Sequence, residues 1–188
     1  MTMLSVEDLV FVDEAGVNLG MTRQFGRALS GQRAYGTLPQ QRGKNVSLIS
    51  AIALRGVIAS TAILGATDGL TFEAFISQRL IPKLWPGACV VMDNASIHQE
   101  AELRPMLNKA GASLHFLSPY SPDFSPIENC WSKLKEFIRS AAPRTYYDLA
   151  TAIETAFQKI SFPDIHHWFT HCCYCLTEYL EPVTEYSI

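Results

Sequence analysis

The stretch Leu9-Val-Phe-Val-Asp13, together with a second stretch that ends in the same way, Val90-Val-Met-Asp93, decides the fold. Each is a short apolar run, typical of a central strand that is covered on both faces. The second run extends from Ala88 to Met92, and a third run covers Leu114 to Leu117. We therefore predict buried strands over 9–12, 88–92 and 114–117, with an aspartate directly past the end of the first two.

The segments around these strands alternate between β-rich and helical patterns. Val46 to Leu64 contains two β-rich runs broken at Arg55-Gly56, which predicts a hairpin with a tight turn. Helical periodicity predicts five helices: one capped by Thr71 and ending near Pro82, His98 to Ala110, Ile127 to Ile138, Leu149 to Phe157, and Pro163 to Leu180. The order predicts an α/β fold, with a mixed sheet and helices packed on its faces.

Asp13 and Asp93 are candidate metal ligands. A carboxylate just past a buried strand lies at the edge where open α/β sheets place their ligands. If the two strands are neighbours, the carboxylates converge, and a divalent cation is the usual way to neutralise two such charges. The alternative is that each aspartate only begins a turn, for which Asp93-Asn94 is well suited.

A third carboxylate, Glu128, follows the rigid approach Ser118-Pro-Tyr-Ser-Pro-Asp-Phe-Ser-Pro126. Pro126 suits the first position of a helix, which makes Ser125 the N-cap and Glu128 the third helical residue. Ser125-x-x-Glu128 is then a capping box, a structural role that requires no metal. Glu128 also lies at the flank of the buried helical stripe, from which it can face the sheet edge.

Length and charge restrict the class of protein. The 188 residues suit one domain, and the apolar content of 48% indicates a folded globular chain. No apolar run is long enough to span a membrane, and the first residues do not resemble a signal peptide, so we expect a cytoplasmic protein. The net charge is −3, but a 22-residue stretch without Asp or Glu holds five cations that we predict to contact DNA: Arg23, Arg27, Arg33, Arg42 and Lys44. The alternative is a solvated loop.

The five cysteines contain no CxxC pair, which is typical of free thiols in a reducing compartment. His167, His171 and Cys175 would share one face of a helix and could bind zinc. However, aromatic and aliphatic residues interleave them as in a packed helix, and no second ligand cluster completes a tetrahedral site. The pattern therefore favours packing over a structural zinc site.

Three motifs resemble those of a known family. Phe11-Val-Asp-Glu-Ala-Gly16, Val91-Met-Asp-Asn-Ala-Ser-Ile-His98 and the segment from Ser118 to Trp131 are similar to the three acidic motifs of mariner-like insertion-sequence transposases, which belong to the DDE superfamily. The 34 residues between Asp93 and Glu128 also match a spacing typical of that superfamily. Arg42-Gly-Lys-Asn45 and Trp168-Phe-Thr-His-Cys-Cys-Tyr174 extend the resemblance over nearly the whole chain.

The resemblance implies an RNase H-like fold, with a five-stranded mixed sheet whose first three strands are antiparallel and with helices on both faces. It implies that Asp13, Asp93 and Glu128 hold two Mg²⁺ or Mn²⁺ ions for phosphoryl transfer on DNA, at transposon ends and target sites. We expect Glu14, Asn94 and His98 to hold these ligands in position through hydrogen bonds. The alternative for His98 is that it only begins its helix.

The resemblance also implies partners. Residues 1–188 are expected to form a single catalytic domain that works as a homodimer, and the helix-turn-helix region that recognises transposon ends is expected outside this chain. That region would be encoded separately or joined by frameshifting, or the chain would be a truncated copy. Two alternatives remain: another RNase H-like nuclease of the junction-resolvase type, and an inactive transposase remnant.

Overall fold

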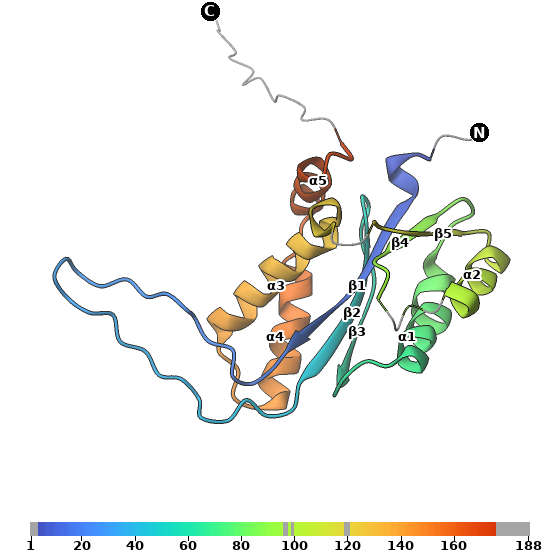
Figure 1. The fold of residues 1–188 in the computed structure, drawn as a ribbon. Helices are drawn as coiled ribbons and strands as arrows, with labels where there is room; N and C mark the ends of the chain where they lie inside the picture. Colours follow the sequence, from blue (N-terminus) through green and yellow to red (C-terminus); the bar gives the residue numbers. More distant parts are fainter. Residues whose placement is uncertain (1–3, 96–97, 99, 119–120, 176–188) are drawn as a thin grey trace, which may run out of the picture.

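Five strands form one sheet in the computed structural model, which describes residues 4–95, 98, 100–118 and 121–175. The order across the sheet is β3-β2-β1-β4-β5 (Figure 1). β1 pairs with β2 and β2 with β3 in antiparallel fashion, whereas β4 is parallel to β1 and β5 is parallel to β4. The expected five-stranded mixed sheet is therefore confirmed. The strands are β1 (Leu9–Val17), β2 (Val46–Ala53), β3 (Gly56–Leu64), β4 (Cys89–Met92) and β5 (Ser113–Phe116).

Strand β1 is longer than the sequence predicted. We expected it to end at Val12, with Asp13 just beyond it, but the strand continues to Val17. The alternative interpretation of Asp13 was the start of a turn, but Asp13 and Glu14 are both strand residues. They stay in the sheet because β2 pairs with β1 over its whole second half, up to Val17 opposite Val46.

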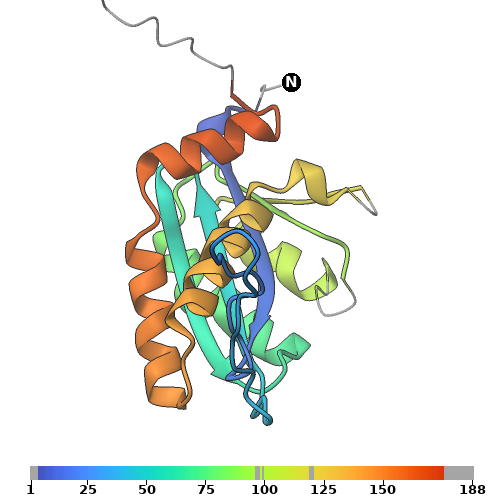
Figure 2. The same cartoon turned by 90° about the vertical axis from the view of Figure 1, so that its left-hand side faces the viewer.

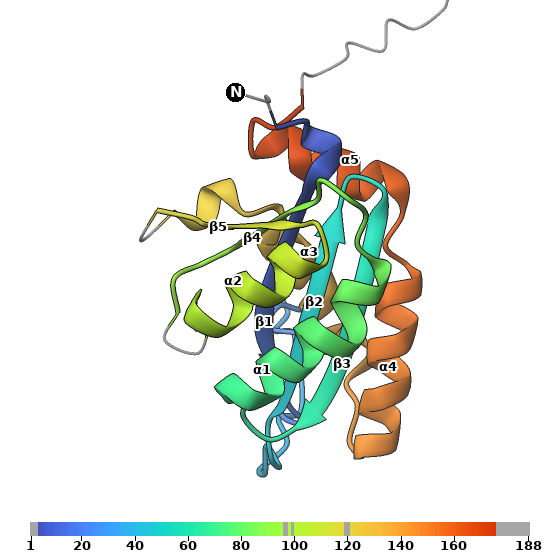
Figure 3. The ribbon, with the colours of Figure 1, turned by 90° about the vertical axis from the view of Figure 1, so that its right-hand side faces the viewer.

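Helices cover both faces of the sheet, as the fold class predicted. α1 (Gly69–Phe75) and α2 (Glu100–Lys109) lie on one face, which Figure 3 shows from the front. α3 (Pro126–Ala141) and α4 (Tyr146–Gln158) lie on the other, and α5 (Phe162–His171) packs across one end of the sheet (Figure 2). Successive side chains of β1 point to opposite faces of the sheet and contribute to both hydrophobic cores. Phe11 and Ala15 pack on the α3 side, and Val10 and Val12 pack on the α1 side.

Short helical turns complete the backbone: η1 (Val6–Asp8), η2 (Ile76–Leu80), η3 (Ile81–Lys83) and η4 (Pro122–Phe124). η2 and η3 prolong α1 through Pro82. The N-cap of α1 is Asp68, whose carboxylate accepts the Thr71 N–H at 2.8 Å, so Thr71 is not the capping residue. Among the described helices, none has the length and apolar character that a membrane span requires.

Helix α5 is shorter than expected. The prediction ran from Pro163 to Leu180, whereas the helix ends at His171 and the chain turns at Cys173, whose φ is 63°. Residues 176–180 of the predicted helix lie outside the described residues. Because the helix ends before Cys175, the helical face that would have aligned His167, His171 and Cys175 does not form.

The start of α5 carries a capping box that the sequence analysis overlooked. The Asp164 carboxylate accepts the Ser161 N–H at 2.8 Å and the Ser161 hydroxyl at 2.6 Å, and Lys133 of α3 donates to the same oxygen. Partial burial works against ionisation, but the hydrogen bonds from Lys133 and Ser161 outweigh it and lower the pKa of Asp164 to about 2. Asp164 therefore links α5 to α3.

We expect Asp164→Ala to lower the free energy of unfolding at pH 7 by ~1–2 kcal/mol, the usual cost of losing a helix cap. Since the folded-state pKa is depressed, this stabilisation is present above the ordinary aspartate pKa and is lost as the pH falls towards 2. Urea denaturation at several pH values measures it. Asp148→Ala is the matched control, because Asp148 holds the same position in α4, is exposed, and makes no side-chain hydrogen bond within the described residues. An equal loss in both variants would contradict the prediction.

Residues 18–45, between β1 and β2, form an arm that projects from the α3 side of the domain (Figures 1 and 2). Hydrogen bonds fix its base to the domain. Arg23 Nε donates to Ser140 Oγ at 3.2 Å, the Lys44 N–H donates to Tyr146 Oη at 2.6 Å, and Arg144 donates to the Leu19 carbonyl at 3.2 Å. Farther out, large side chains are open to solvent, including Phe25 and Tyr35, which are 90% and 91% exposed.

Candidate active site

The register of the sheet brings Asp13 and Asp93 together. β1 pairs with β4 from Leu9 opposite Cys89 to Phe11 opposite Val91. Two more residues along each chain lead to Asp13 and to Asp93. β4 ends at Met92, while Asp13 remains paired with Ser50 of β2. Asp13 therefore lies in the middle of a strand, beside the point where its parallel neighbour stops, and not at a strand end as predicted.

All three predicted carboxylates line one cavity of about 410 Å³. Asp13 comes from β1, Asp93 from the end of β4, and Glu128 from the first turn of α3. Asn94 lines the same cavity, together with Ser118, Ser121 and Ser125. The carboxylates share a cavity without converging on one point. Among the described residues, no three His, Cys, Asp or Glu side chains are close enough together to hold a metal ion.

Asp13 has the most perturbed carboxylate of the cavity. Its Oδ2 accepts a hydrogen bond from Trp131 Nε1 at 2.9 Å, and Trp131 is buried on α3. The pKa of Asp13 is raised to about 7, mainly by burial and also by the negative charges of Glu128 and Glu14, while hydrogen bonds from the Glu14 backbone and from Trp131 oppose the rise. Asp13 is thus a carboxylate whose charge lacks compensation.

Asp93 is held through His98 on the opposite side of the sheet from Trp131. The His98 ring is buried, with Nδ1 2.9 Å from the carbonyl oxygen of Asp93 and 2.9 Å from its Oδ1. Its Nε2 lies 3.1 Å from Glu14 Oε1, and the ring packs on Phe72 with 4.4 Å between centroids. Burial opposes protonation, but the bonds to Glu14 and Asp93 outweigh it and raise the pKa of His98. His98 precedes α2 and ties Asp93 to Glu14 of β1.

Glu128 does not form the capping box that its sequence suggested. Ser125 occupies the N-cap position of α3, but its side chain makes no capping hydrogen bond. The turn is closed only by the backbone, where the Glu128 N–H donates to the Ser125 carbonyl at 3.1 Å. Within the described residues the Glu128 carboxylate makes no hydrogen bond, and it is exposed to the cavity. The structural role that competed with metal binding at this residue is therefore absent.

Two residues that the sequence analysis did not assign to the site support it. One is Trp131, a buried residue of α3 whose bond to Asp13 the sequence analysis did not predict. A buried indole N–H needs an acceptor, which is the signal that could have identified it. The other is Tyr174, which packs on Phe11 and donates its hydroxyl to the Phe124 carbonyl at 2.9 Å. Tyr174 thereby holds the segment that leads into Glu128.

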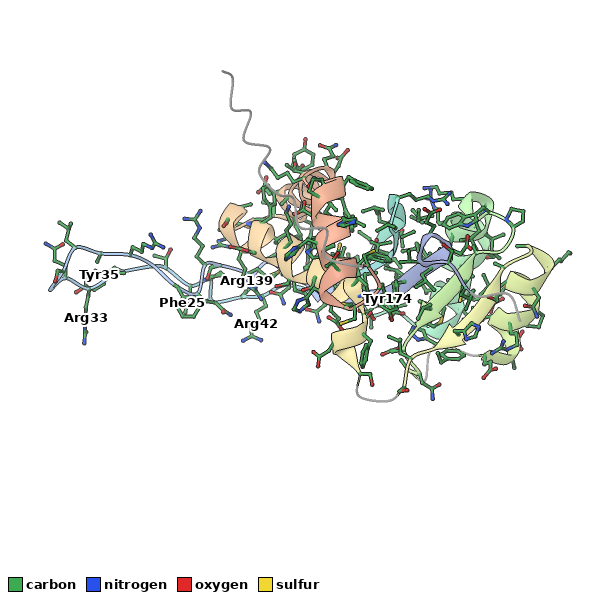
Figure 4. All side chains as sticks on the ribbon, turned by 90° about the horizontal axis from the view of Figure 1, so that it is seen from above. Phe25, Arg33, Tyr35, Arg42, Arg139 and Tyr174 are labelled. Carbon is green, nitrogen blue, oxygen red and sulfur yellow. The ribbon has the colours of Figure 1, made fainter. Side chains whose placement is uncertain are left out.

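The five cations predicted to contact DNA lie on the arm, and only part of the set is near the site. All five are exposed: Arg23, Arg27, Arg33, Arg42 and Lys44. Figure 4 shows Arg42 at the root of the arm and Arg33 at its far end. The structure therefore separates the predicted cluster into cations beside the domain and cations held away from it.

The carboxylate cavity fits a hard divalent cation. Its charged lining consists of three carboxylates, and no Lys or Arg lines it among the described residues. The uncharged oxygen atoms that could bind a metal belong to the Asn94 amide and to serine hydroxyls. Oxygen donors of this kind suit Mg²⁺ and Mn²⁺. The raised pKa of Asp13 marks negative charge that a cation would compensate.

Comparisons with known proteins agree with this geometry. The family model described as DDE superfamily endonuclease matches residues 8–150, which is most of the chain. No curated protein matches the sequence.

Solved structures show the same fold. The Mos1 mariner paired end complex with Mg has a TM-score of 0.70 at 16% identity, covering 94% of this chain and 57% of that chain. The Mos1 strand transfer complex has a TM-score of 0.68 at 18% identity, covering 89% of this chain and 54% of that one. The Mos1 catalytic domain with Raltegravir and Mn has a TM-score of 0.63 at 16% identity, covering 94% and 86%. The chain thus spans little more than half of the longer relatives and most of the isolated catalytic domain.

Proposed function

This chain belongs to the DDE superfamily endonucleases, and from that membership we propose that it is the catalytic domain of a DNA transposase. It would cleave transposon ends and join them to target DNA. The observation that carries the proposal is the cavity lined by Asp13, Asp93 and Glu128, whose described lining contains no Lys or Arg.

Asp13, Asp93 and Glu128 are the residues that would hold the metals. Two Mg²⁺ or Mn²⁺ ions, when bound, supply the charge that activates a water or a DNA 3′-hydroxyl and that stabilises the leaving oxygen. Support comes from the oxygen donors of the cavity and from the Mos1 structures, which contain Mn or Mg.

The other residues of the site hold these ligands in place. The indole of Trp131 donates to one oxygen of Asp13 and so fixes the orientation of this carboxylate. His98 bonds to Asp93 through one ring nitrogen and to Glu14 through the other, so it maintains the position of Asp93 beside β1. Phosphoryl transfer depends mainly on positioning and charge, and such fixed side chains provide positioning.

DNA is the proposed partner. Mos1 occurs in a paired end complex and in a strand transfer complex, and the fold of this chain is similar. We further propose that the active complex is a homodimer and that a helix-turn-helix region, on this or another polypeptide, recognises the transposon ends.

The test uses a supercoiled plasmid, a labelled DNA end with a free 3′-hydroxyl, and Mn²⁺. A transposase nicks DNA and also joins the labelled end to the plasmid, and the Asp93→Asn variant should do neither. Nicking without joining would indicate an RNase H-like nuclease of the resolvase type. If the wild-type protein neither nicks nor joins DNA when mariner-type ends are supplied, it is an inactive remnant and the proposal is contradicted.

Tyr174→Phe tests whether the segment before Glu128 must be held. The variant keeps the packing on Phe11 and removes only the hydrogen bond to the Phe124 carbonyl. We expect a loss of stability of about 1 kcal/mol or less and a fall in the cleavage rate of about tenfold, with little change in DNA affinity. The matched control is Tyr147→Phe, since Tyr147 is exposed on α4. An unchanged cleavage rate would show that the bond does not position Glu128.

A further inference from the structure

A second cavity, of about 370 Å³, lies where the root of the arm meets α3. Its cationic lining consists of Arg42 from the arm and Lys135 and Arg139 from α3, and its described lining contains no Asp or Glu. Figure 4 shows Arg42 and Arg139 together at the arm root, whereas Arg33 and Tyr35 lie at the far end of the arm. We call this the cationic cavity.

The cations of this cavity form no ion pair within the described part of the chain. Arg42, Lys135 and Arg139 are absent from the ion pairs of the structure, whereas the neighbouring Lys133 is paired with Asp164. The stem of Arg42 lies against the Gly20 backbone, where an added Cβ would be 2.8 Å from Arg42 Cγ. Three cations held in one concave surface create a positive potential that favours an anionic ligand.

Helix α3 connects the cationic cavity to the carboxylate cavity. Glu128, Ser132, Lys135 and Arg139 are spaced at i, i+4, i+7 and i+11, which places them on one stripe of the helix. Lys135 lies about 10 Å along the axis from Glu128, given a rise of about 1.5 Å per residue. The cationic cavity is therefore next to the proposed reaction site along α3.

Strand β1 gives the same connection independently. Asp13 lines the carboxylate cavity, and Gly16 and Asn18 line the cationic cavity. Asp13 and Gly16 are about 10 Å apart at about 3.3 Å per strand residue. Two elements thus place the cavities at the same separation, roughly the axial rise of three base pairs of a duplex at ~3.4 Å per base pair.

We propose that the cationic cavity binds backbone phosphates of the DNA strand whose cleaved linkage lies in the carboxylate cavity. The proposal rests on the proposed function and assigns Lys135 and Arg139, together with Arg42, to phosphate contact. The adjoining cavity, which contains Arg23 and Arg139, is less suited to an anion because Glu136 also lines it.

The test measures binding of the full chain to a duplex oligonucleotide by fluorescence anisotropy, in EDTA, over a series of salt concentrations. Each phosphate contact adds about 0.9 to the slope of log affinity against log salt. Lys135→Gln/Arg139→Gln should therefore lower that slope by about 1.8 and weaken binding at 0.1 M salt by about 60-fold, roughly eightfold for each contact. Arg139→Lys keeps the charge and should retain most of the affinity.

The matched control is Lys83→Gln/Lys109→Gln, which removes the same charge from two exposed positions, in η3 and α2. Equal slopes for this control and the Lys135/Arg139 variant would overturn the phosphate site, as would the absence of DNA binding at low salt. The assay needs no catalysis, so the two ideas fail separately. If the wild type cleaves DNA but the Lys135→Gln/Arg139→Gln variant keeps the wild-type salt slope, only the phosphate site is contradicted. If the variant has a lowered slope but the wild type does not cleave DNA, only the transposase proposal is contradicted.

Discussion

Glu128→Gln should abolish metal-dependent DNA cleavage while leaving the melting temperature nearly unchanged. The amide has no charge to hold a divalent cation and only one good oxygen ligand. A metal ion contributes several kcal/mol to such a reaction, so the cleavage rate should fall by at least ~100-fold, since each 1.36 kcal/mol is a factor of ten. Plasmid nicking with Mn²⁺ measures the rate, and thermal denaturation measures the stability.

The stability of a second variant, Glu128→Ala, makes this test stricter. If Glu128 were part of a capping box, its replacement by alanine would destabilise the protein. However, the Glu128 carboxylate makes no hydrogen bond within the described residues, and Ser125 forms no side-chain cap. We therefore expect Glu128→Ala to change the free energy of unfolding by less than ~0.5 kcal/mol, as is usual for an exposed position. Glu154→Gln, on the exposed side of α4, is the control. If Glu128→Gln cleaves DNA as fast as the wild type, Glu128 is not needed for the reaction.

Asp13→Asn should abolish Mn²⁺ binding and, in the metal-free protein, increase stability. The folded protein raises the pKa of Asp13 from 3.8 to about 7, so ionising this carboxylate opposes folding. The whole shift corresponds to about 4 kcal/mol, and we expect about half of that because the side chain is partly open to solvent. Asparagine has no charge to desolvate and still accepts the bond from Trp131.

The stability that Asp13→Asn gains over the wild type should depend on pH. Between the unfolded pKa and the folded pKa, the folded state binds more protons than the unfolded state, so the wild type loses stability as the pH rises towards 7. The advantage of Asp13→Asn should therefore be largest near pH 8 and smaller at pH 5. Mn²⁺ binding to the wild type should weaken below pH 7, because the ligand must lose its proton.

Urea denaturation at pH 5 and pH 8 without metal, and calorimetric titration with Mn²⁺, measure these effects. Asp148→Asn at an exposed position of α4 is the control and should change neither quantity. A lower stability for Asp13→Asn at pH 8 would show that the Asp13 carboxylate is compensated in the fold. Unchanged Mn²⁺ binding in both Asp13→Asn and Asp93→Asn would disprove a shared metal site.

The sequence alone determined the strands, the hairpin and the order of the helices. Those features depend on local patterns: apolar runs bounded by polar residues, turn residues at Arg55-Gly56, and the apolar stripe of α3. The sequence made the proximity of Asp13 and Asp93 conditional on their strands being neighbours, and the parallel pairing of β1 with β4 meets that condition. The bounds of β1 could not be predicted, because its second half is held by pairing with β2, which local periodicity does not reveal.

Only the tertiary structure decided the surroundings of the carboxylates. The bond from Trp131 to Asp13 spans 118 residues, and the bond between His98 and Glu14 spans 84. Ser125 and Glu128 had the sequence of a capping box but not its hydrogen bonds, since side-chain direction depends on the packing of α3 against the sheet. The cationic cavity likewise joins Arg42 to Arg139, which are distant in sequence. Charge, burial and orientation at a site arise from packing between distant segments, whereas strands and helices arise from neighbours along the chain.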